Sequence, residues 1–156
     1  MLVSEIMTRE VRTVGADWSL EELKTFLLEH GISGAPVVDD KNKLVGVVST
    51  TDLLRTEEGL EVQSNNPSDF FVSSLKRPLS KAELLTMHVE TTSSQVVRDV
   101  MTPIVFSVPD DTDVLDVADL MVRGRVHRLV VTRNDALCGI VSALDLVRAL
   151  RDQIRA

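Results

Sequence analysis

Short apolar runs in the first third of the chain predict three strands. They lie at 11–14, 35–38 and 45–49, and each is rich in valine. Branched residues in runs this short, bounded by polar and turn-forming residues, are typical of buried strands.

A different spacing separates the first two strands. Leucines recur at helical intervals in SLEELKTFLLEHG, Ser19 and Glu22 match a capping box, and Gly31 supplies a stop signal. A second helix is predicted in TTDLLRTEEG, directly after the third strand. The expected order is therefore strand, helix, strand, strand, helix.

This order of elements occurs twice. The stretch VSEIMTREVRTV is echoed by VRDVMTPIVFSV ninety-four residues later, and APVVDDKNKLVGVVSTTDLLR is echoed by LVVTRNDALCGIVSALDLVR. The copies span about 53 residues each, at 3–55 and 97–149. A unit of that size is near the lower limit for independent folding, so we expect the two copies to pack together.

The repeats divide the chain into a first domain at 1–60, an insert at 61–96 and a second domain at 97–156. A polar, turn-rich loop starts at residue 56, in the last part of the first domain, and continues into the insert. Short helices are predicted in DFFVSSLKR and in the stretch that starts at Ser80. The insert either spaces the repeats and covers a sheet edge, or it binds a partner or gates the module.

The motifs IMT, HGISGAPVVDDKNKLVGVVSTTDLL and VHRLVVTRNDALCGIVSALDLV resemble the two halves of a tandem cystathionine-β-synthase (CBS) domain pair, or Bateman module. The resemblance implies an α+β fold in which two β-α-β-β-α repeats pack as an intramolecular pseudo-dimer. It implies clefts between the repeats that commonly hold adenosine nucleotides or S-adenosylmethionine. It also implies pairing of modules into homodimers.

A Ser-x-x-Asp motif follows the third strand of each repeat and marks the first candidate site. It places a hydroxyl at the strand end and a carboxylate at the helix start, where free backbone N–H groups favour anions. Ribose and phosphate suit this geometry, and the resemblance implies ribose-binding aspartates at both positions. The competing interpretation is that the residues only cap their helices. The candidates are Ser49, Thr51, Asp52, Ser142 and Asp145.

Basic residues gather in RGRVHRLVV, within an otherwise acidic chain. The resemblance implies that His127 and Arg128 contact nucleotide phosphate, although consecutive strand residues face opposite ways and only one can enter a given cleft. The first repeat has Ser33 and Gly34 at these positions, so the two sites are expected to differ electrostatically.

The resemblance further implies an apolar adenine slot built from two neighbourhoods. An adenine ring needs apolar walls edged by backbone groups, although such residues also serve as ordinary core. The first neighbourhood comprises Thr8, Arg12 and Ile32, and the second comprises Thr102, Phe106 and Val126.

Composition excludes several classes. The 156 residues carry a net charge of −7 and 3% aromatic residues, which argues against nucleic acid as a partner. Three scattered histidines and one cysteine predict no metal site and no internal disulfide. No apolar run approaches a membrane span, so a cytoplasmic protein without membrane association is expected.

We therefore expect a regulatory module that binds AMP, ADP, ATP or S-adenosylmethionine, requires no cofactor, forms a homodimer and signals to a separate effector protein. A ligand-independent scaffold of the same fold is the alternative. No nucleophile with its base, phosphate loop or dinucleotide fingerprint is present, so no enzymatic activity is expected. Apolar stripes in 19–29 and 112–123 are the expected source of a dimer interface.

Overall fold

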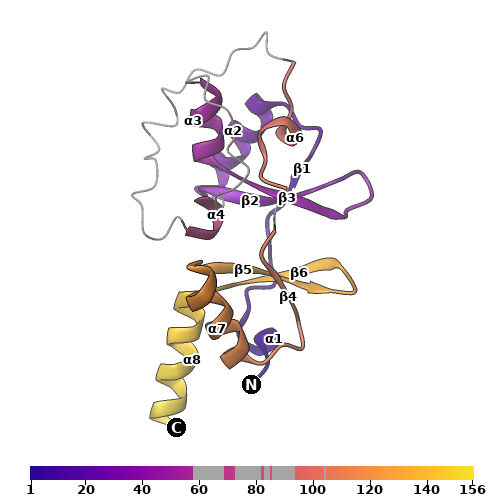
Figure 1. The fold of residues 1–156 in the computed structure, drawn as a ribbon. Coiled ribbons are helices and arrows are strands. Elements are labelled where there is room, and N and C mark those ends of the chain that lie inside the picture. The colour runs from indigo at the N-terminus through magenta and orange to yellow at the C-terminus, as the bar shows by residue number, and fades with distance from the viewer. Residues whose placement is uncertain (58–68, 73–81, 83–84, 86–93, 104) are drawn as a thin grey trace. The chain divides into compact units, whose positions relative to one another are not determined.

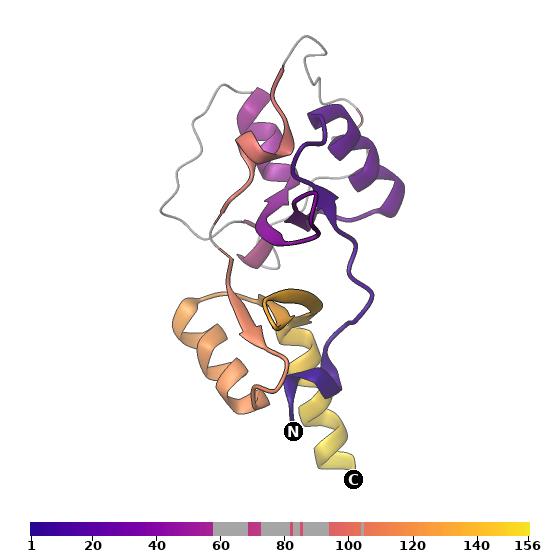
Figure 2. The ribbon, with the colours of Figure 1, turned by 90° about the vertical axis from the view of Figure 1, so that its right-hand side faces the viewer.

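The computed structural model contains two compact units, and the chain passes between them twice (Figures 1 and 2). It describes residues 1–57, 69–72, 82, 85, 94–103 and 105–156. One unit comprises residues 12–105, and the other comprises residues 1–11 and 106–156. The compact units therefore have different boundaries from the sequence repeats.

The unit of residues 12–105 is built on a three-stranded sheet of order β1-β2-β3. Strand β1 pairs parallel with β2, and β2 pairs antiparallel with β3. Its strands are β1 (Val14–Gly15), β2 (Gly34–Val38) and β3 (Leu44–Ser49), and its helices are α2 (Leu20–His30), α3 (Thr50–Glu57), α4 (Asp69–Val72) and α6 (Val97–Val100).

The other unit repeats this topology with a sheet of order β4-β5-β6. Its strands are β4 (Ser107–Pro109), β5 (Arg128–Arg133) and β6 (Ala136–Ser142), and its helices are α1 (Val3–Ile6), α7 (Val114–Gly124) and α8 (Ala143–Arg155). The expected α+β class with two repeated sets of elements is confirmed. The helix predicted after the third strand of each repeat is also confirmed, as α3 and α8.

The ends of α2 follow from the capping residues in the sequence. The Ser19 hydroxyl accepts the Glu22 backbone N–H, and the Glu22 carboxylate accepts the Ser19 N–H. Gly31 ends the helix with φ +60°, a conformation that glycine adopts without steric cost. The predicted helix is thus confirmed, and Leu20, Leu23 and Leu27 point into the core of the unit.

The strand predicted at 11–14 is wrong over most of its length, because β1 comprises only Val14 and Gly15. These two residues lie opposite Val37 and Val38 of β2. The residues just before them form the connection between the two units and have no partner strand. The valine pattern alone therefore predicts a longer strand than the structure contains.

Part of the insert belongs to the core. Phe70 and Phe71 of α4 are 2% and 1% exposed, and their rings meet edge to face at 5.1 Å. Phe70 lies against Gly34 in β2, where a Cβ atom would come within 3.2 Å of its ring. The interpretation that the insert covers the sheet holds for α4. The helix predicted from Ser80 falls largely outside the described residues.

Each unit receives its leading segment from the other sequence repeat. Thr8 and Ile140 exchange backbone hydrogen bonds of 2.8 and 2.9 Å, so the first Met-Thr motif pairs with β6. Thr102 and Val47 exchange bonds of 2.8 and 2.9 Å, so the second Met-Thr motif pairs with β3. The repeats are therefore interleaved.

Two glycines permit this close approach. A Cβ atom on Gly46 would lie 2.6 Å from the Thr102 carbonyl oxygen and 2.9 Å from the Met101 sulfur. A Cβ atom on Gly139 would collide with the Met7 sulfur. The Met-Thr segment thus lies directly on a strand backbone that has no side chain at the crossing point.

We predict that Gly46→Ala and Gly139→Ala each destabilise the protein by about 1–3 kcal/mol, because the added methyl group forces the packed segment away from its strand. Urea denaturation measures the change. Gly124→Ala in α7 is the matched control, since its Cβ would meet no heavy atom closer than 3.5 Å and alanine favours helix. Equal stability of all three variants would contradict the close contact of the Met-Thr segments with Gly46 and Gly139.

Candidate functional site

Both Ser-x-x-Asp motifs form the same hydrogen-bonded turn. Asp145 Oδ2 accepts the Ser142 backbone N–H at 2.8 Å and the Ser142 hydroxyl at 2.7 Å. Asp52 Oδ2 accepts the Ser49 backbone N–H at 2.8 Å and the Ser49 hydroxyl at 3.2 Å. In α8 the Ser142 hydroxyl also accepts the Asp145 backbone N–H at 3.3 Å, which completes a capping box. The aspartate bonds of the first motif stand in the same way at the start of α3.

The second carboxylate oxygen of each aspartate faces an arginine. Arg148 Nη1 donates to Asp145 Oδ1 at 3.3 Å, and Arg55 Nη1 lies 3.7 Å from Asp52 Oδ1. No role was predicted for Arg55 and Arg148 from the sequence, although both stand three residues after the aspartate. A ribose hydroxyl that approached Oδ1 would have to share that oxygen with the guanidinium.

Burial distinguishes the two motifs. The Asp52 side chain is 1% exposed and the Asp145 side chain is 12% exposed. Thr51 is half-buried, whereas Leu144 at the corresponding position is 56% exposed. A ligand therefore reaches the second carboxylate with less rearrangement than the first.

Arg128 is placed beside the second motif by strand register. It is the first residue of β5 and lies opposite Ser142, the last residue of β6 and the N-cap of α8. Burial lowers the pKa of the Arg128 guanidinium, because removing the cation from water disfavours its charged form. This arrangement gathers a cation, a hydroxyl and a carboxylate at one end of the sheet.

The first repeat lacks this cation. Gly34 lies opposite Ser49 in β2–β3, and a Cβ atom there would be 2.7 Å from the Val48 carbonyl oxygen. An arginine side chain would therefore meet backbone at this position. The expected difference between the sites thus has a steric basis as well as an electrostatic one.

The neighbouring His127 tethers the helix through its backbone. Its carbonyl oxygen accepts the Ala143 N–H at 2.9 Å, as the Ser33 oxygen accepts the Thr50 N–H at 2.8 Å. These bonds hold the first residue of α8 or α3 against the start of the neighbouring strand. The His127 side chain itself is half-buried.

The residues of each expected adenine neighbourhood are divided between the two units. Thr8 belongs to the unit of residues 1–11 and 106–156, whereas Arg12 and Ile32 belong to the other unit. The expected neighbourhoods therefore each draw on both units. The unit of residues 1–11 and 106–156 holds Thr8, Phe106, Val126, His127, Arg128, Ser142 and Asp145. The unit of residues 12–105 holds Arg12, Ile32, Ser49, Thr51, Asp52 and Thr102.

The accessibility of these candidates varies. Thr8 and Arg12 are exposed, and Ile32 and Phe106 are half-buried. Thr102 is 5% exposed and Val126 is 2% exposed, so both serve mainly as core in this conformation. The exposed Thr8 is held by its backbone bonds to Ile140, which lies two residues before Ser142 on β6.

The remaining basic residues of RGRVHRLVV have structural roles. Arg123 pairs with Asp119 one turn earlier at 2.9 Å. Arg125 ends α7 with φ 52°, where the first repeat uses Gly31. Arg128 is therefore the member of this cluster that lies nearest the Ser-x-x-Asp motif in the sheet.

The described residues lack the features of two other kinds of site. They contain no group of three or more histidine, cysteine, aspartate or glutamate side chains arranged to hold a metal ion. Among the same residues, none of the helices is long and apolar enough to cross a bilayer.

Known proteins match almost the whole chain. The uncharacterized protein MJ1426 of Methanocaldococcus jannaschii is 34% identical over 96% of this chain and 91% of its own length. The chloroplastic CBS domain-containing protein CBSX2 of Arabidopsis thaliana is 33% identical over 94% of this chain and 62% of its own length. A crystal structure of CBSX2 in complex with AMP superimposes with a TM-score of 0.68 and 30% identity, covering 99% of this chain and 98% of that one.

The model of the CBS domain matches two segments, residues 3–59 and 97–152. These segments contain both Met-Thr motifs and both Ser-x-x-Asp turns, and together they make up most of the chain. The chain therefore belongs to the CBS domain family, with two CBS domains in tandem.

Proposed function

We propose that the protein is a regulatory module that binds an adenosine nucleotide and transmits the bound state to a separate effector protein. The observation that carries this proposal is the convergence of Arg128, Ser142 and Asp145 where β5 and β6 meet α8. The first can neutralise a phosphate, and the other two can hydrogen bond to ribose or phosphate oxygens. The AMP complex of the related CBSX2 supports the choice of ligand.

The β5–β6 end is the stronger of the two proposed sites. It has a cation, a partly accessible carboxylate and the exposed Thr8 beside β6. In the other unit, Asp52 is buried and Gly34 occupies the position of Arg128. We propose that the site built on Ser49, Thr51 and Asp52 binds a phosphate more weakly. No catalytic role is assigned to either set.

A ligand changes the module only through different affinities for two conformations. The Asp145 carboxylate offers a local basis for such a difference, since its Oδ1 accepts a hydrogen bond from the exposed Arg148. A ribose hydroxyl at that oxygen would compete with Arg148 and weaken this bond on α8, where an effector could detect the change. The candidate ligands are AMP, ADP, ATP and S-adenosylmethionine.

One observation favours the alternative of a ligand-independent scaffold. Oδ2 of both aspartates is engaged by its own turn, and Asp52 is almost completely buried. In this alternative the motifs stabilise helix starts and have no ligand. The experiments below separate the two functions.

Saturating AMP is expected to raise the melting temperature by roughly 5–11 °C, since a ligand at a hundred times its Kd adds about 2.7 kcal/mol. Thermal-shift measurements would compare AMP, ADP, ATP, S-adenosylmethionine and adenosine. Arg128→Gln is expected to reduce the AMP shift more than the adenosine shift, because adenosine lacks the phosphate. A flat response to the whole panel at millimolar concentration would favour the scaffold.

Asp145→Asn and Ser142→Ala separate capping from ligand binding. Loss of either cap group is expected to cost about 0.5–2 kcal/mol of stability. Asp145→Asn should also weaken AMP about tenfold by calorimetry, since it replaces a charged acceptor, whereas Ser142→Ala should have the smaller effect on binding. Destabilisation of both variants with unchanged AMP affinity would show that the aspartate is only a cap.

We also propose a homodimer, with a surface that differs from the expected one in leaving out α2 and adding α8. The apolar stripe of α2 is used within its own unit, where Leu20, Leu23 and Leu27 are buried. Two described helices present apolar side chains to solvent. The expected helix α7 exposes Leu115, Leu120 and Val122 by 41–77%, and α8, which has no buried residue, exposes Leu144, Val147, Leu150 and Ile154 by 56–76%. An apolar face of this kind on a helix is typical of an interface.

Leu150→Glu is expected to shift the protein from dimer to monomer, because a charge in an apolar contact is costly to bury. Multi-angle light scattering would show the mass fall to that of one 17.2 kDa chain. Lys41→Glu, an exposed change in the β2–β3 turn, should leave the dimer intact. A wild-type protein that is monomeric at micromolar concentration, with and without AMP, would remove the dimer from the proposal.

A further inference from the structure

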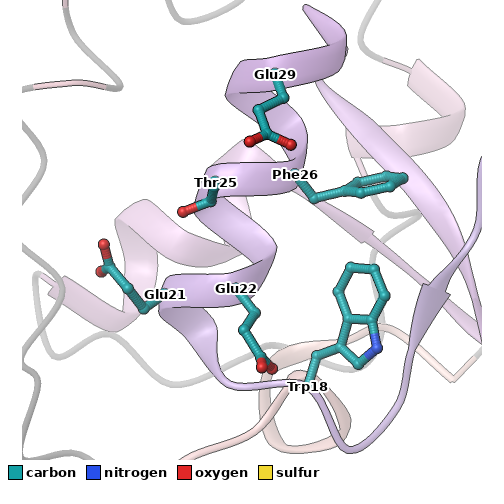
Figure 3. Close-up of a pocket in the computed structure, with 6 residues that line it drawn as sticks. All are labelled: Trp18, Glu21, Glu22, Thr25, Phe26 and Glu29. Carbon is teal, nitrogen blue, oxygen red and sulfur yellow. The ribbon is translucent and has the colours of Figure 1, made fainter.

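A groove of about 510 Å³ lies along α2, away from the Ser-x-x-Asp turns (Figure 3). The six residues that line it are two aromatics, three glutamates and one threonine: Trp18, Phe26, Glu21, Glu22, Glu29 and Thr25. Figure 3 shows the Trp18 and Phe26 rings on the same side of the helix, with Glu22 beside Trp18. The lining therefore combines aromatic surface with negative charge and contains no cation.

The aromatic part of the groove is held in place by packing. Trp18 and Phe26 meet edge to face at 5.3 Å, and Phe26 meets the His30 ring at 4.4 Å. The indole lies directly over Gly15, where a Cβ atom would come within 2.5 Å of its five-membered ring. Both groove aromatics are half-buried, so they rest on the core and still present ring surface to the groove.

The carboxylates are available to a ligand. Glu22 uses Oε2 to accept the Ser19 N–H at 2.8 Å, which leaves its other oxygen. Glu21 and Glu29 are exposed, and neither has an ion pair with any other described residue. They stand on one face of α2 at helical spacing, together with Thr25. A cation in the groove would have the two rings and Glu22 on one side and Glu21 and Thr25 on the other (Figure 3).

The fold itself does not require this groove. In the second repeat, Thr112, Leu120 and Arg123 occupy the positions of Trp18, Phe26 and Glu29 on the corresponding helix α7. There Arg123 is neutralised by Asp119 at 2.9 Å. The second repeat keeps acidic residues on this face, Asp116 and Asp119, but it has no aromatic residue at these positions and pairs Asp119 with Arg123. The combination of aromatic rings with carboxylates that have no cationic neighbour in the lining is therefore particular to the first repeat.

We propose that the groove along α2 binds an arginine or lysine side chain from a basic segment of a protein partner. A guanidinium or ammonium group gains from the face of an aromatic ring and from nearby carboxylates, and its apolar stem can lie on the ring edges. The proposal rests on the part of the proposed function that assigns a protein partner to the module. It is independent of the adenosine site.

Trp18 is the single tryptophan of the chain and reports on its own groove by fluorescence. The probe is a capped tetra-arginine peptide, titrated at about 0.15 M salt to screen nonspecific attraction to the acidic protein. We expect a saturable change in fluorescence, confirmed by calorimetry. A capped tetra-glutamate peptide should produce no change.

Phe26→Leu and Glu21→Gln/Glu29→Gln should each weaken tetra-arginine about fivefold, as expected for a partly exposed cation–π contact or two surface charges. Asp40→Asn/Asp135→Asn is the matched control, since it removes the same charge from exposed positions in the hairpin turns. The control should bind like the wild type. AMP calorimetry on the same variants should be unchanged, so the two proposals can fail separately.

Three results would overturn the inference. They are the absence of saturable binding to the wild type, equal weakening in the groove and control variants, and dissociation of a dimer by the peptide. The first two would leave only general attraction to an acidic surface. The third, read by light scattering, would show that a second copy of the chain occupies the groove.

Discussion

The short backbone pairings between the Met-Thr segments and strands β3 and β6 are the constraint on which the rest of the structure depends. Each consists of two backbone hydrogen bonds next to a glycine whose lack of a side chain permits the close approach. Each joins a segment from one repeat to a sheet from the other. Because the crossing involves main-chain atoms, it does not determine the exposure of the threonine side chain. Thr8 beside β6 is exposed, whereas Thr102 beside β3 is buried.

This interleaving also determines which candidate residues share a unit. Thr8 joins Arg128 and Asp145 although more than a hundred residues separate it from either in sequence. The exchange equips both units with the same frame of sheet, capped helix and crossing segment. Substitutions within that frame, Arg128 against Gly34 above all, then make the two sites chemically unequal.

The repeat, the helices and their ends could be predicted because each depends on local residues. Ser19, Glu22 and Gly31 determine the ends of α2 through contacts within a few positions. The strand at 11–14 was overestimated because pairing depends on a neighbour that the valines do not specify. The exchange of segments was not predictable for a related reason, since periodicity shows which side chains are buried but not which strand receives them. The role of Asp52 and Asp145 stayed open because a helix cap and a ribose contact call for the same residues.

The exchange of segments also has a consequence for the order in which the protein can fold during synthesis. Residues 1–11 leave the ribosome well before their partner strand β6, which ends at Ser142. The unit of residues 12–105 has its complete sequence much earlier and can close while the rest is still being translated. The segment of residues 1–11 must therefore wait, with its backbone bonds to β6 unmade, until β6 has also emerged.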